Sequence, residues 1–332
     1  MSVDVNCHDA LRDARVGVAT ACLLLSVPMG CAVDPPRFHT SSLKPPLTAE
    51  IEKQLGPLRF KGAVAVARTE GKFFGWSGLW VSPDGSHFAG VDGGDWAQGT
   101  LSYDRDGNLA SLTVQAAGPL LDDKRQPFAQ PDDKDAEALD FDGSRFLVGF
   151  ETHDRVLAYR DFTSAAEPIQ LPAEALVGIP RGAGFSSVAH LPNGSTIVLP
   201  EYTADDPQNM RVSTRTRGWL LTKNGSGPVW LRKGRGLPVS LSAFPNGDLL
   251  LLEVLPNRVK ITDTRLSRIS AKEIEIGSTM RPKELATLRP PLVDGRFEGS
   301  SVRRGTRGET LLYLMVNDRP AALYMFELSD EP

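Results

Sequence analysis

Cysteine is scarce in this sequence and confined to one end of it. The three cysteines, Cys7, Cys22 and Cys31, all lie before residue 32. The rest of the chain can therefore form no internal disulfide bond and no metal site built from thiolates. Its folded state must depend on the burial of apolar side chains instead.

A strong excess of charge of either sign is also missing. The 332 residues include 37 Lys and Arg against 41 Asp and Glu, which gives a net charge of −4. This balance creates no basic field for nucleic acid and no basic run for a membrane surface. With 41% hydrophobic residues, the composition is typical of a soluble globular protein with a sizeable core. We expect a monomer that binds no nucleic acid.

Residues 16–33 carry no charge and follow Arg12 and Arg15. A basic flank, an apolar stretch and a small-residue end indicate a secretory signal. A glycine precedes Cys31, as at a bacterial lipoprotein cleavage site, so Cys31 is a candidate for lipidation. We expect residues 1–31 to be a signal peptide, the protein to reach the periplasm, and a lipid to be its sole membrane attachment. An uncleaved apolar helix is the alternative.

The segment after this signal is rich in proline. Residues 32–57 include two Pro-Pro pairs, which favour an extended and stiff chain. We therefore expect a tether over residues 32–57, with a possible short helix near residues 47–55. A single folded domain is expected over residues 58–332.

One phrase recurs along that domain. It consists of a short apolar lead, an Asp-Gly or Asn-Gly turn, an apolar run and a carboxylate. Four copies and a looser fifth span residues 77–92, 136–151, 186–201, 239–253 and 297–318. The interval of about 50 to 60 residues matches a β-propeller blade. Asn-Gly and Asp-Gly tolerate the positive φ angles that two-residue hairpin turns demand, and the apolar runs fit inner strands buried between blades.

A single blade cannot bury both of its faces, so the repeats must stack in a ring that closes. Residues 58–68 resemble a strand that has no turn partner of its own. We predict that they pair with the C-terminal blade beside residues 322–329. The predicted fold is all-β, a β-propeller of five four-stranded blades. A sixth blade is possible in residues 94–135 or 256–296.

Several of these phrases are similar to those of a known family. They are "SGLWVSPDG…GVDGGD", "DAEALDFDGSRFLVGFE", the two Pro-Asn-Gly copies and "FEGSSV…LYLMVND". With them the chain resembles the bacterial esterase-like, phytase-like domain family from near residue 58 to its end. The resemblance implies an exported β-propeller that hydrolyses phosphate or carboxylic esters. In that family an acidic residue often opens the third and fourth repeats, where this chain has Ser187 and Ser240.

Two sets of acidic residues are candidates for a channel site. Glu137 and Glu298 open predicted inner strands, and a second set follows the apolar runs: Asp92, Glu151, Glu201, Glu253 and Asp318. Carboxylates that face one another across a channel repel unless a cation neutralises them, and their oxygens favour Ca²⁺ or Mg²⁺. The spacing from turn glycine to acid varies, so the alternation of strand side chains keeps some of these acids from pointing inward unless a bulge intervenes. Strand-end acids that cap strands or pair with arginines are the alternative.

Basic residues and one histidine are weaker candidates for binding a substrate. Arg232, Arg303 and Arg304 lie in basic loops, and arginine suits phosphate oxygens if these loops share one rim. His153 adjoins Glu151. A solvated outer surface explains the same arginines, and a lone histidine beside a turn is usually structural.

The leading hypothesis is an exported propeller that hydrolyses phosphate or carboxylic esters of small molecules with a divalent cation such as Ca²⁺. Its rival is a non-catalytic periplasmic propeller that binds a ligand or a partner protein. A metal-dependent lactonase would differ from the first only in substrate. Neither Ser77 nor Ser186 lies in a nucleophile-elbow motif, so no catalytic residue is assigned.

Overall fold

The computed structural model describes residues 37–69, 73, 75–204, 214–232, 234–255, 263–293, 295–318 and 320–329. All of them belong to one compact unit, Pro35–Pro332. The predicted signal peptide and Cys31 lie outside the described residues. Among the described residues, no helix is long and apolar enough to cross a membrane.

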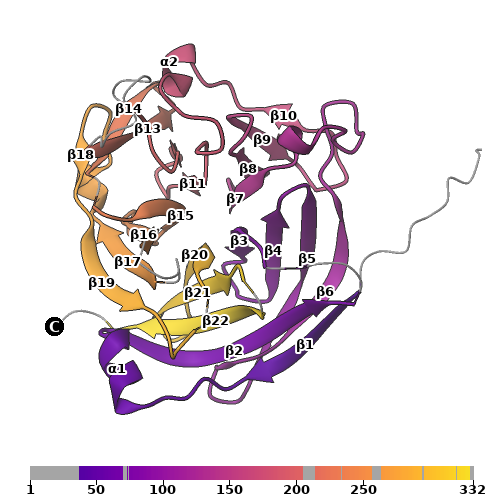
Figure 1. The fold of residues 1–332 in the computed structure, drawn as a ribbon, viewed down its shortest axis with the longest axis vertical. Helices are drawn as coiled ribbons and strands as arrows, with labels where there is room; N and C mark the ends of the chain where they lie inside the picture. The colour runs from indigo at the N-terminus through magenta and orange to yellow at the C-terminus, as the bar shows by residue number, and fades with distance from the viewer. Residues whose placement is uncertain are drawn as a thin grey trace, which may run out of the picture. The chain divides into compact units, whose positions relative to one another are not determined.

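The described residues form five antiparallel sheets arranged as the blades of a propeller (Figure 1). The first three blades along the chain contain β3 (Gly78–Val81), β4 (His87–Asp92), β5 (Asp95–Tyr103) and β6 (Leu109–Pro119); β7 (Ala136–Phe141), β8 (Phe146–Phe150), β9 (Arg155–Tyr159) and β10 (Glu167–Pro168); and β11 (Ser187–His190), β12 (Thr196–Leu199), β13 (Arg215–Thr222) and β14 (Gly225–Arg232). The other two contain β15 (Leu237–Ala243), β16 (Leu249–Leu255), β17 (Asp263–Ile269) and β19 (Lys283–Leu288); and β20 (Phe297–Arg304), β21 (Thr310–Val316), β22 (Ala321–Leu328) and β2 (Leu58–Arg68). The inner strands β3, β7, β11, β15 and β20 each contact the inner strands of both neighbouring blades, so the ring is closed.

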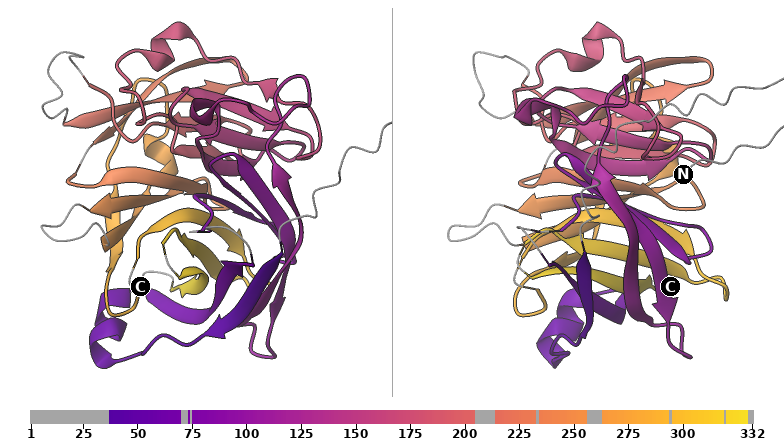
Figure 2. Two further views of the ribbon diagram at one scale, coloured as in Figure 1. Left: turned by 45° about the vertical axis from the view of Figure 1, so that its right-hand side comes forward. Right: turned by 90° about the vertical axis from the view of Figure 1, so that its right-hand side faces the viewer.

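The closing blade joins the two ends of the domain. β2 pairs antiparallel with β22, from Leu58 opposite Leu328 to Val66 opposite Ala321. The prediction that residues 58–68 pair with the C-terminal blade is therefore confirmed. A further strand, β1 (Phe38–Leu43), pairs with the outer edge of β2 and makes this sheet five-stranded. The side views show β1 and β2 running together along the outside of this blade (Figure 2).

The predicted tether is wrong for the part of residues 32–57 that the structure describes. After β1 comes helix α1 (Ala49–Leu55), which begins at the N-cap Thr48 and packs Ile51 and Leu55 into the core. The short helix expected near residues 47–55 is thus present. β1 escaped notice because it is an edge strand whose sequence is largely polar, FHTSSL, and only Phe38, Thr40 and Leu43 are partly buried.

Both intervals that left room for a sixth blade belong to the five blades already counted. Residues 94–135 form β5 and β6 with their connections, including a 3-10 turn at Pro131–Asp133. Residues 263–288 supply β17, β19 and a two-residue strand, β18 (Thr279–Met280), with a 3-10 turn at Ala271–Glu273. β18 pairs in parallel with β14 and extends the third blade. A second short helix, α2 (Ala173–Leu176), lies between the second and third blades in the chain.

The core lies between blades, which explains the continuous apolar runs. All four leucines of Leu249–Leu252 in β16 are fully buried, because both faces of the strand are covered. Gly78 and Gly299, near the starts of β3 and β20, let neighbouring inner strands approach. A Cβ at Gly299 would lie 2.7 Å from the Trp76 carbonyl oxygen, and one at Gly78 would lie 2.7 Å from the backbone of Ala138.

The repeated turns have a different geometry from the predicted two-residue hairpin. In the copies at Gly85, Gly194 and Gly247, the glycine N–H donates to the carbonyl three residues earlier, and the glycine φ lies between 79° and 88°. The preceding Asn193 and Asn246 do not adopt positive φ. Proline at the second position, Asn or Asp at the third and a left-handed glycine at the fourth are typical of a type I turn followed by a bulge.

We expect the seam between β2 and β22 to dominate the stability of the ring. Leu323→Ala removes a fully buried side chain opposite Val64 and should lower the free energy of unfolding by about 3 kcal/mol. Arg59→Ala, an exposed change on the same seam, should alter it by less than about 0.5 kcal/mol. Urea denaturation of both variants measures the difference. Equal effects would contradict closure through apolar packing.

Candidate functional site

The starts of the inner strands surround a cavity of about 180 Å³. Its lining comes from four blades, and its polar part, which includes Glu137, Glu151, Glu201 and Glu298, comes from three of them. The charge of Asp92 raises the pKa values of Glu137 and Glu298, and its Oδ1 accepts a hydrogen bond from Ser77 Oγ. We call this cavity, with these five carboxylates, the acidic mouth.

Three of the inner strands carry a β-bulge at the residue that lines this cavity. In β7, Ala136 pairs with Phe150 and Ala138 with Gly149, so Glu137 is the extra residue. Glu298 in β20 and Val239 in β15 occupy the same position in their own strands. A bulge re-aims one side chain relative to the strict alternation of a strand. It therefore supplies the inward orientation that the sequence left open.

Glu151 and Glu201 reach the same mouth from the second strands of their blades. Each residue follows a strand, β8 and β12 respectively, that runs antiparallel to the inner strand. Because an antiparallel neighbour returns the chain to the end where the inner strand began, the two acids meet the starts of the inner strands. The backbone N–H of Glu201 donates to Ala183 at 3.1 Å, which fixes this turn.

Neutral donors join Asp92 to Glu298. Ser77 Oγ lies 3.1 Å from Asp92 Oδ1 and 3.4 Å from Glu298 Oε2. Asn317 Nδ2 donates to Ser77 Oγ at 2.7 Å and also to Glu298 Oε2. The cation of this network is Arg296, whose Nε lies 2.5 Å from Glu298 Oε1. Among the described residues that line the cavity, Arg296 is the basic one.

Burial and mutual repulsion raise the pKa values of Asp92, Glu137, Glu151 and Glu298. Burial raises the pKa of Asp92 to about 6 and that of Glu298 to about 7, in the latter case against the attraction of Arg296. Burial, followed by the charges of Glu298 and Asp92, holds the pKa of Glu137 well above its usual range. Burial and the charges of Glu137 and Glu201 do the same for the pKa of Glu151. The mouth therefore holds more negative charge than its own donors can stabilise.

Two predicted candidates lie away from the cavity. Glu253 is 1% exposed and pairs with Arg265, whose Nε and NH2 lie 2.9 and 2.8 Å from Glu253 Oε2. Glu253 lies opposite Pro238 as Phe150 lies opposite Ala136, so it stands one residue before the position of Glu151 and faces the other way, while Val254 lines the cavity. At the fifth repeat the cavity is lined by Asn317 rather than by Asp318.

The basic candidates do not share the rim of the acidic mouth. Arg303 and Arg304 lie at the opposite ends of the inner strands. Arg232 lines a separate cavity that also contains Glu253. His153 is exposed, and its Nδ1 lies 2.6 Å from Asp133 Oδ1. The expectation that these residues form one substrate-binding rim is therefore not met.

The serines compared with the family's acids also need a correction. The cavity is lined by Ser186 and Val239, each one residue before the expected Ser187 and Ser240. Ser186 Oγ donates to the Pro238 carbonyl at 3.0 Å, whereas Ser240 Oγ lies 2.8 Å from Ser300 Oγ. The third and fourth repeats thus place a hydroxyl and an isopropyl group where the second and fifth place glutamates.

Three residues of the mouth were not selected from the sequence as site residues: Ser77, Arg296 and Asn317. A signal for Ser77 existed, because "WSGLW", "AEALD" and "FEGSS" place Ser77, Glu137 and Glu298 at matching positions. Arg296 precedes β20 by one residue, and Asn317 directly follows β21. Nothing in the repeat marks either of these two residues as functional.

The donors of the acidic mouth fit a calcium ion in their chemistry. Carboxylates, the Asn317 amide and the Ser77 hydroxyl are hard oxygen ligands, and the excess of negative charge favours a cation. Among the residues that the structure describes, no three Asp, Glu, His or Cys side chains are grouped closely enough to share one ion. The carboxylates would therefore have to move inward to coordinate a metal.

A profile of the family described as "Phytase-like: Esterase-like activity of phytase" matches residues 71–318. A search of curated proteins finds no match.

Three solved structures illustrate the similarity. An endo-arabinase from Bacteroides thetaiotaomicron is 10% identical, over 79% of this chain and 99% of that one, with a TM-score of 0.45. A gluconolactonase from Xanthomonas campestris is 10% identical, over 90% and 96%, with a TM-score of 0.41. A PQQ-bound aldose sugar dehydrogenase from Streptomyces coelicolor is 10% identical, over 88% and 99%, with a TM-score of 0.42. None of the three bears on which reaction this chain performs.

The raised pKa values predict how stability depends on pH when no cation is bound. Asp92 and Glu298 bind protons more tightly in the folded chain than in the unfolded chain, whose carboxyls titrate near ~4. Their contribution to stability is therefore fully present below a pH of ~4 and is lost as the pH rises to about 7. In EDTA, the free energy of unfolding should fall across this window by on the order of 2 kcal/mol.

Urea denaturation at a series of pH values measures this slope. Glu298→Gln should flatten it, because the amide does not titrate, whereas the exposed Glu167→Gln should leave it unchanged. The same slope in the Glu298 variant and in the unaltered protein would show that this carboxyl keeps an ordinary pKa.

Proposed function

The chain belongs to the phytase-like family, whose profile covers most of its length, and from that membership we propose that it hydrolyses phosphate or carboxylic esters of small molecules with the help of a divalent cation. The observation that carries the proposal is the acidic mouth. Five carboxylates from four blades meet Arg296 there, and burial raises the pKa values of Asp92, Glu137, Glu151 and Glu298. Such a cluster gains most from a bound cation, and oxygen ligands favour Ca²⁺.

Each part of the mouth has a role in this proposal. Glu137 and Glu298, aimed inward by their bulges, would hold the cation together with Asp92, Glu151 and Glu201. A divalent cation supplies polarisation of the ester oxygen and a lowered pKa for a bound water.

The remaining lining positions the substrate. Arg296 is 42% exposed and uses its Nε on Glu298, which leaves guanidinium N–H groups for a substrate oxygen. Arginine forks match phosphate geometry, so Arg296 favours phosphate esters over carboxylic esters. Leu237, Val239 and Val254 from the adjacent fourth blade form the apolar part of the lining, which limits access of bulk water.

Calcium should stabilise the protein and support turnover. We expect calcium to raise the melting temperature of EDTA-treated protein, and the calcium-loaded protein to hydrolyse p-nitrophenyl phosphate or p-nitrophenyl acetate. Glu137→Gln and Glu298→Gln should each lower both the thermal shift and the rate by at least about tenfold, since each removes one charged ligand. Glu167→Gln, which removes an exposed carboxylate, is the matched control.

Two results would redirect the proposal. A thermal shift without turnover of either ester would favour the rival hypothesis of a non-catalytic propeller, and a lactone panel would then test the lactonase variant. No thermal shift and no turnover would reject the cation-dependent hydrolase altogether.

We also propose that the protein is exported to the periplasm and anchored by a lipid on Cys31. The support is the uncharged stretch of residues 16–33 after Arg12 and Arg15. In a Gram-negative host, mass spectrometry should find a mature chain that begins with a lipidated Cys31 in the membrane fraction. Cys31→Ser should move the protein out of that fraction. A full-length chain in the cytoplasm would contradict export.

A further inference from the structure

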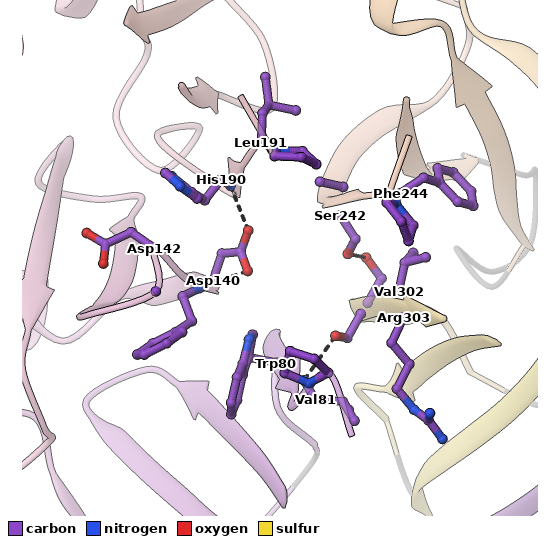
Figure 3. A pocket seen from close by; sticks show the side chains of 18 of the residues that line it. Trp80, Val81, Asp140, Asp142, His190, Leu191, Ser242, Phe244, Val302 and Arg303 are labelled. Atoms are coloured by element: carbon purple, nitrogen blue, oxygen red, sulfur yellow. Dashed lines mark hydrogen bonds between the residues drawn. The ribbon is translucent and has the colours of Figure 1, made fainter. Parts of the chain in front are cut away.

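A second, larger cavity lies at the opposite ends of the inner strands. It has a volume of about 590 Å³ and shares no lining residue with the acidic mouth. Its walls include Trp80, Asp140, His190, Ser242 and Ser300 (Figure 3). We call this cavity the far pocket. It is large enough for a drug-sized organic molecule.

Asp140 is the charged group directed into the far pocket (Figure 3). Its Oδ2 accepts the His190 N–H at 2.7 Å, and its Oδ1 accepts the Phe141 N–H at 2.8 Å. No cation is among the groups that act on this carboxyl, and burial raises its pKa to about 7. Two backbone donors thus fix the orientation of the carboxylate, while each oxygen keeps a lone pair for another partner.

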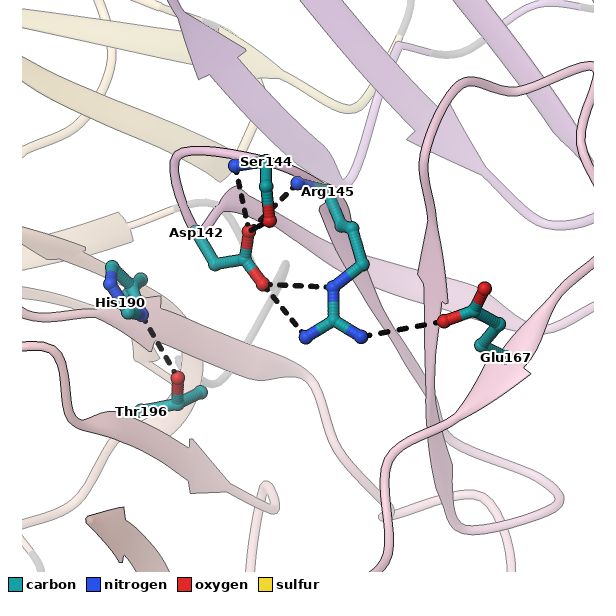
Figure 4. Close-up of polar contacts among 6 residues, drawn as sticks. All are labelled: Asp142, Ser144, Arg145, Glu167, His190 and Thr196. Carbon is teal, nitrogen blue, oxygen red and sulfur yellow. Dashed lines mark hydrogen bonds and ion pairs between the residues drawn. The ribbon is translucent and has the colours of Figure 1, made fainter. Parts of the chain in front are cut away.

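The neighbouring polar groups of this wall are already engaged with each other. Asp142 accepts Arg145 Nε at 3.1 Å and NH2 at 3.0 Å, and Arg145 also reaches Glu167 (Figure 4). His190 Nδ1 lies 3.1 Å from Thr196 Oγ1, and burial lowers the pKa of His190, which keeps its ring neutral. The His190 ring is therefore neutral and Arg145 is engaged with Asp142, so neither compensates the charge of Asp140.

The arginines on the other side of the pocket are unsuited to hold an anion inside it. Arg303 Nε donates to Tyr313 Oη at 3.0 Å, and its guanidinium lies over the rings of Tyr103 and Tyr313. Figure 3 shows Arg303 extending away from Asp140. Arg304 is exposed at the rim. The interior of the pocket is therefore negative at Asp140 rather than positive.

An aromatic group stands next to this carboxylate. Trp80 lies on β3, the inner strand adjacent to the β7 strand of Asp140, and it is only half-buried. Its ring packs against Phe141 and Phe146 at 5.2 and 5.5 Å between centroids, which restricts its orientation. Across the pocket, Ser242 Oγ and Ser300 Oγ lie 2.7 Å apart and engage each other. A carboxylate beside an indole is an arrangement that attracts organic cations.

We propose that the far pocket binds a small organic ammonium ion, with its cationic nitrogen between the Asp140 carboxylate and the Trp80 indole. A charge-assisted hydrogen bond or ion pair would use the free lone pairs of Asp140. The indole would add a cation–π contact, and the apolar part of the ligand would lie against Leu191, Phe244 and Val302. This site is separate from the proposed ester chemistry and does not depend on it.

Calorimetry with four probes of similar size tests the charge preference on the full chain. Benzylamine and benzyltrimethylammonium should bind at least about tenfold more tightly than benzyl alcohol, and benzoate should bind least. The preference should persist in saturating calcium, which separates it from attraction to the acidic mouth. Benzoate or benzyl alcohol binding as tightly as the amines would overturn the proposal, as would no binding of any amine.

Two variants test whether the probes bind in the far pocket. Asp140→Asn should reduce benzylamine affinity by about tenfold, and Trp80→Leu should reduce benzyltrimethylammonium affinity by about threefold or more. Glu167→Gln removes an exposed carboxylate and should change neither affinity. Amine binding that survives both pocket variants would place the ligand elsewhere. If either variant fails to fold, the probe comparison on the unaltered protein still decides the charge preference.

Discussion

Antiparallel pairing of β2 with β22 closes the ring, and the geometry of both ends of the pore depends on it. Each inner strand is buried against two others only when the circle is complete, because an open array would leave the first and last blades with an apolar face in water. Closure sets the five inner strands around one axis. Ring closure then brings together residues that are remote in sequence, such as Ser77, Glu137 and Glu298.

The same closure carries an energetic cost at the acidic mouth. Ring formation buries acids that would be hydrated and far apart in the unfolded chain, so their charged forms are disfavoured. Among the described residues, the neutral donors Ser77 and Asn317 and the cation of Arg296 offset part of this cost. Elsewhere the same protein pairs a buried acid with an arginine, as in the Glu253–Arg265 pair, and burial still raises the pKa of Glu253. At the mouth, the charges of neighbouring carboxylates raise the pKa values of Glu137 and Glu151 further.

The repeat made the fold predictable, whereas the site was only partly so. Turn glycines and apolar runs gave the blades, and a strand without a partner gave the closure with β22. β1 was missed because an edge strand with one solvated face needs little apolar sequence. At the site, the spacing argument foresaw that some acids would turn away, and Glu253 does so. Arg296 and Asn317 follow no repeated pattern, so only the coordinates bring them to the acids.

The bulges explain why one strand can serve both ends of the pore. Glu137 and Asp140 are three residues apart on β7, and strict alternation would place them on opposite faces. The extra residue at Glu137 breaks the alternation, so both carboxylates reach the pore, one in each cavity. β20 has the same bulge at Glu298, and Ser301, three residues later, lines the far pocket. β15 has the same bulge, but its bulged residue is Val239, so the bulge is present even where no carboxylate lines the cavity. The bulge is therefore a feature of the backbone in these three blades, and the side chain at the bulged position determines what the acidic mouth can bind.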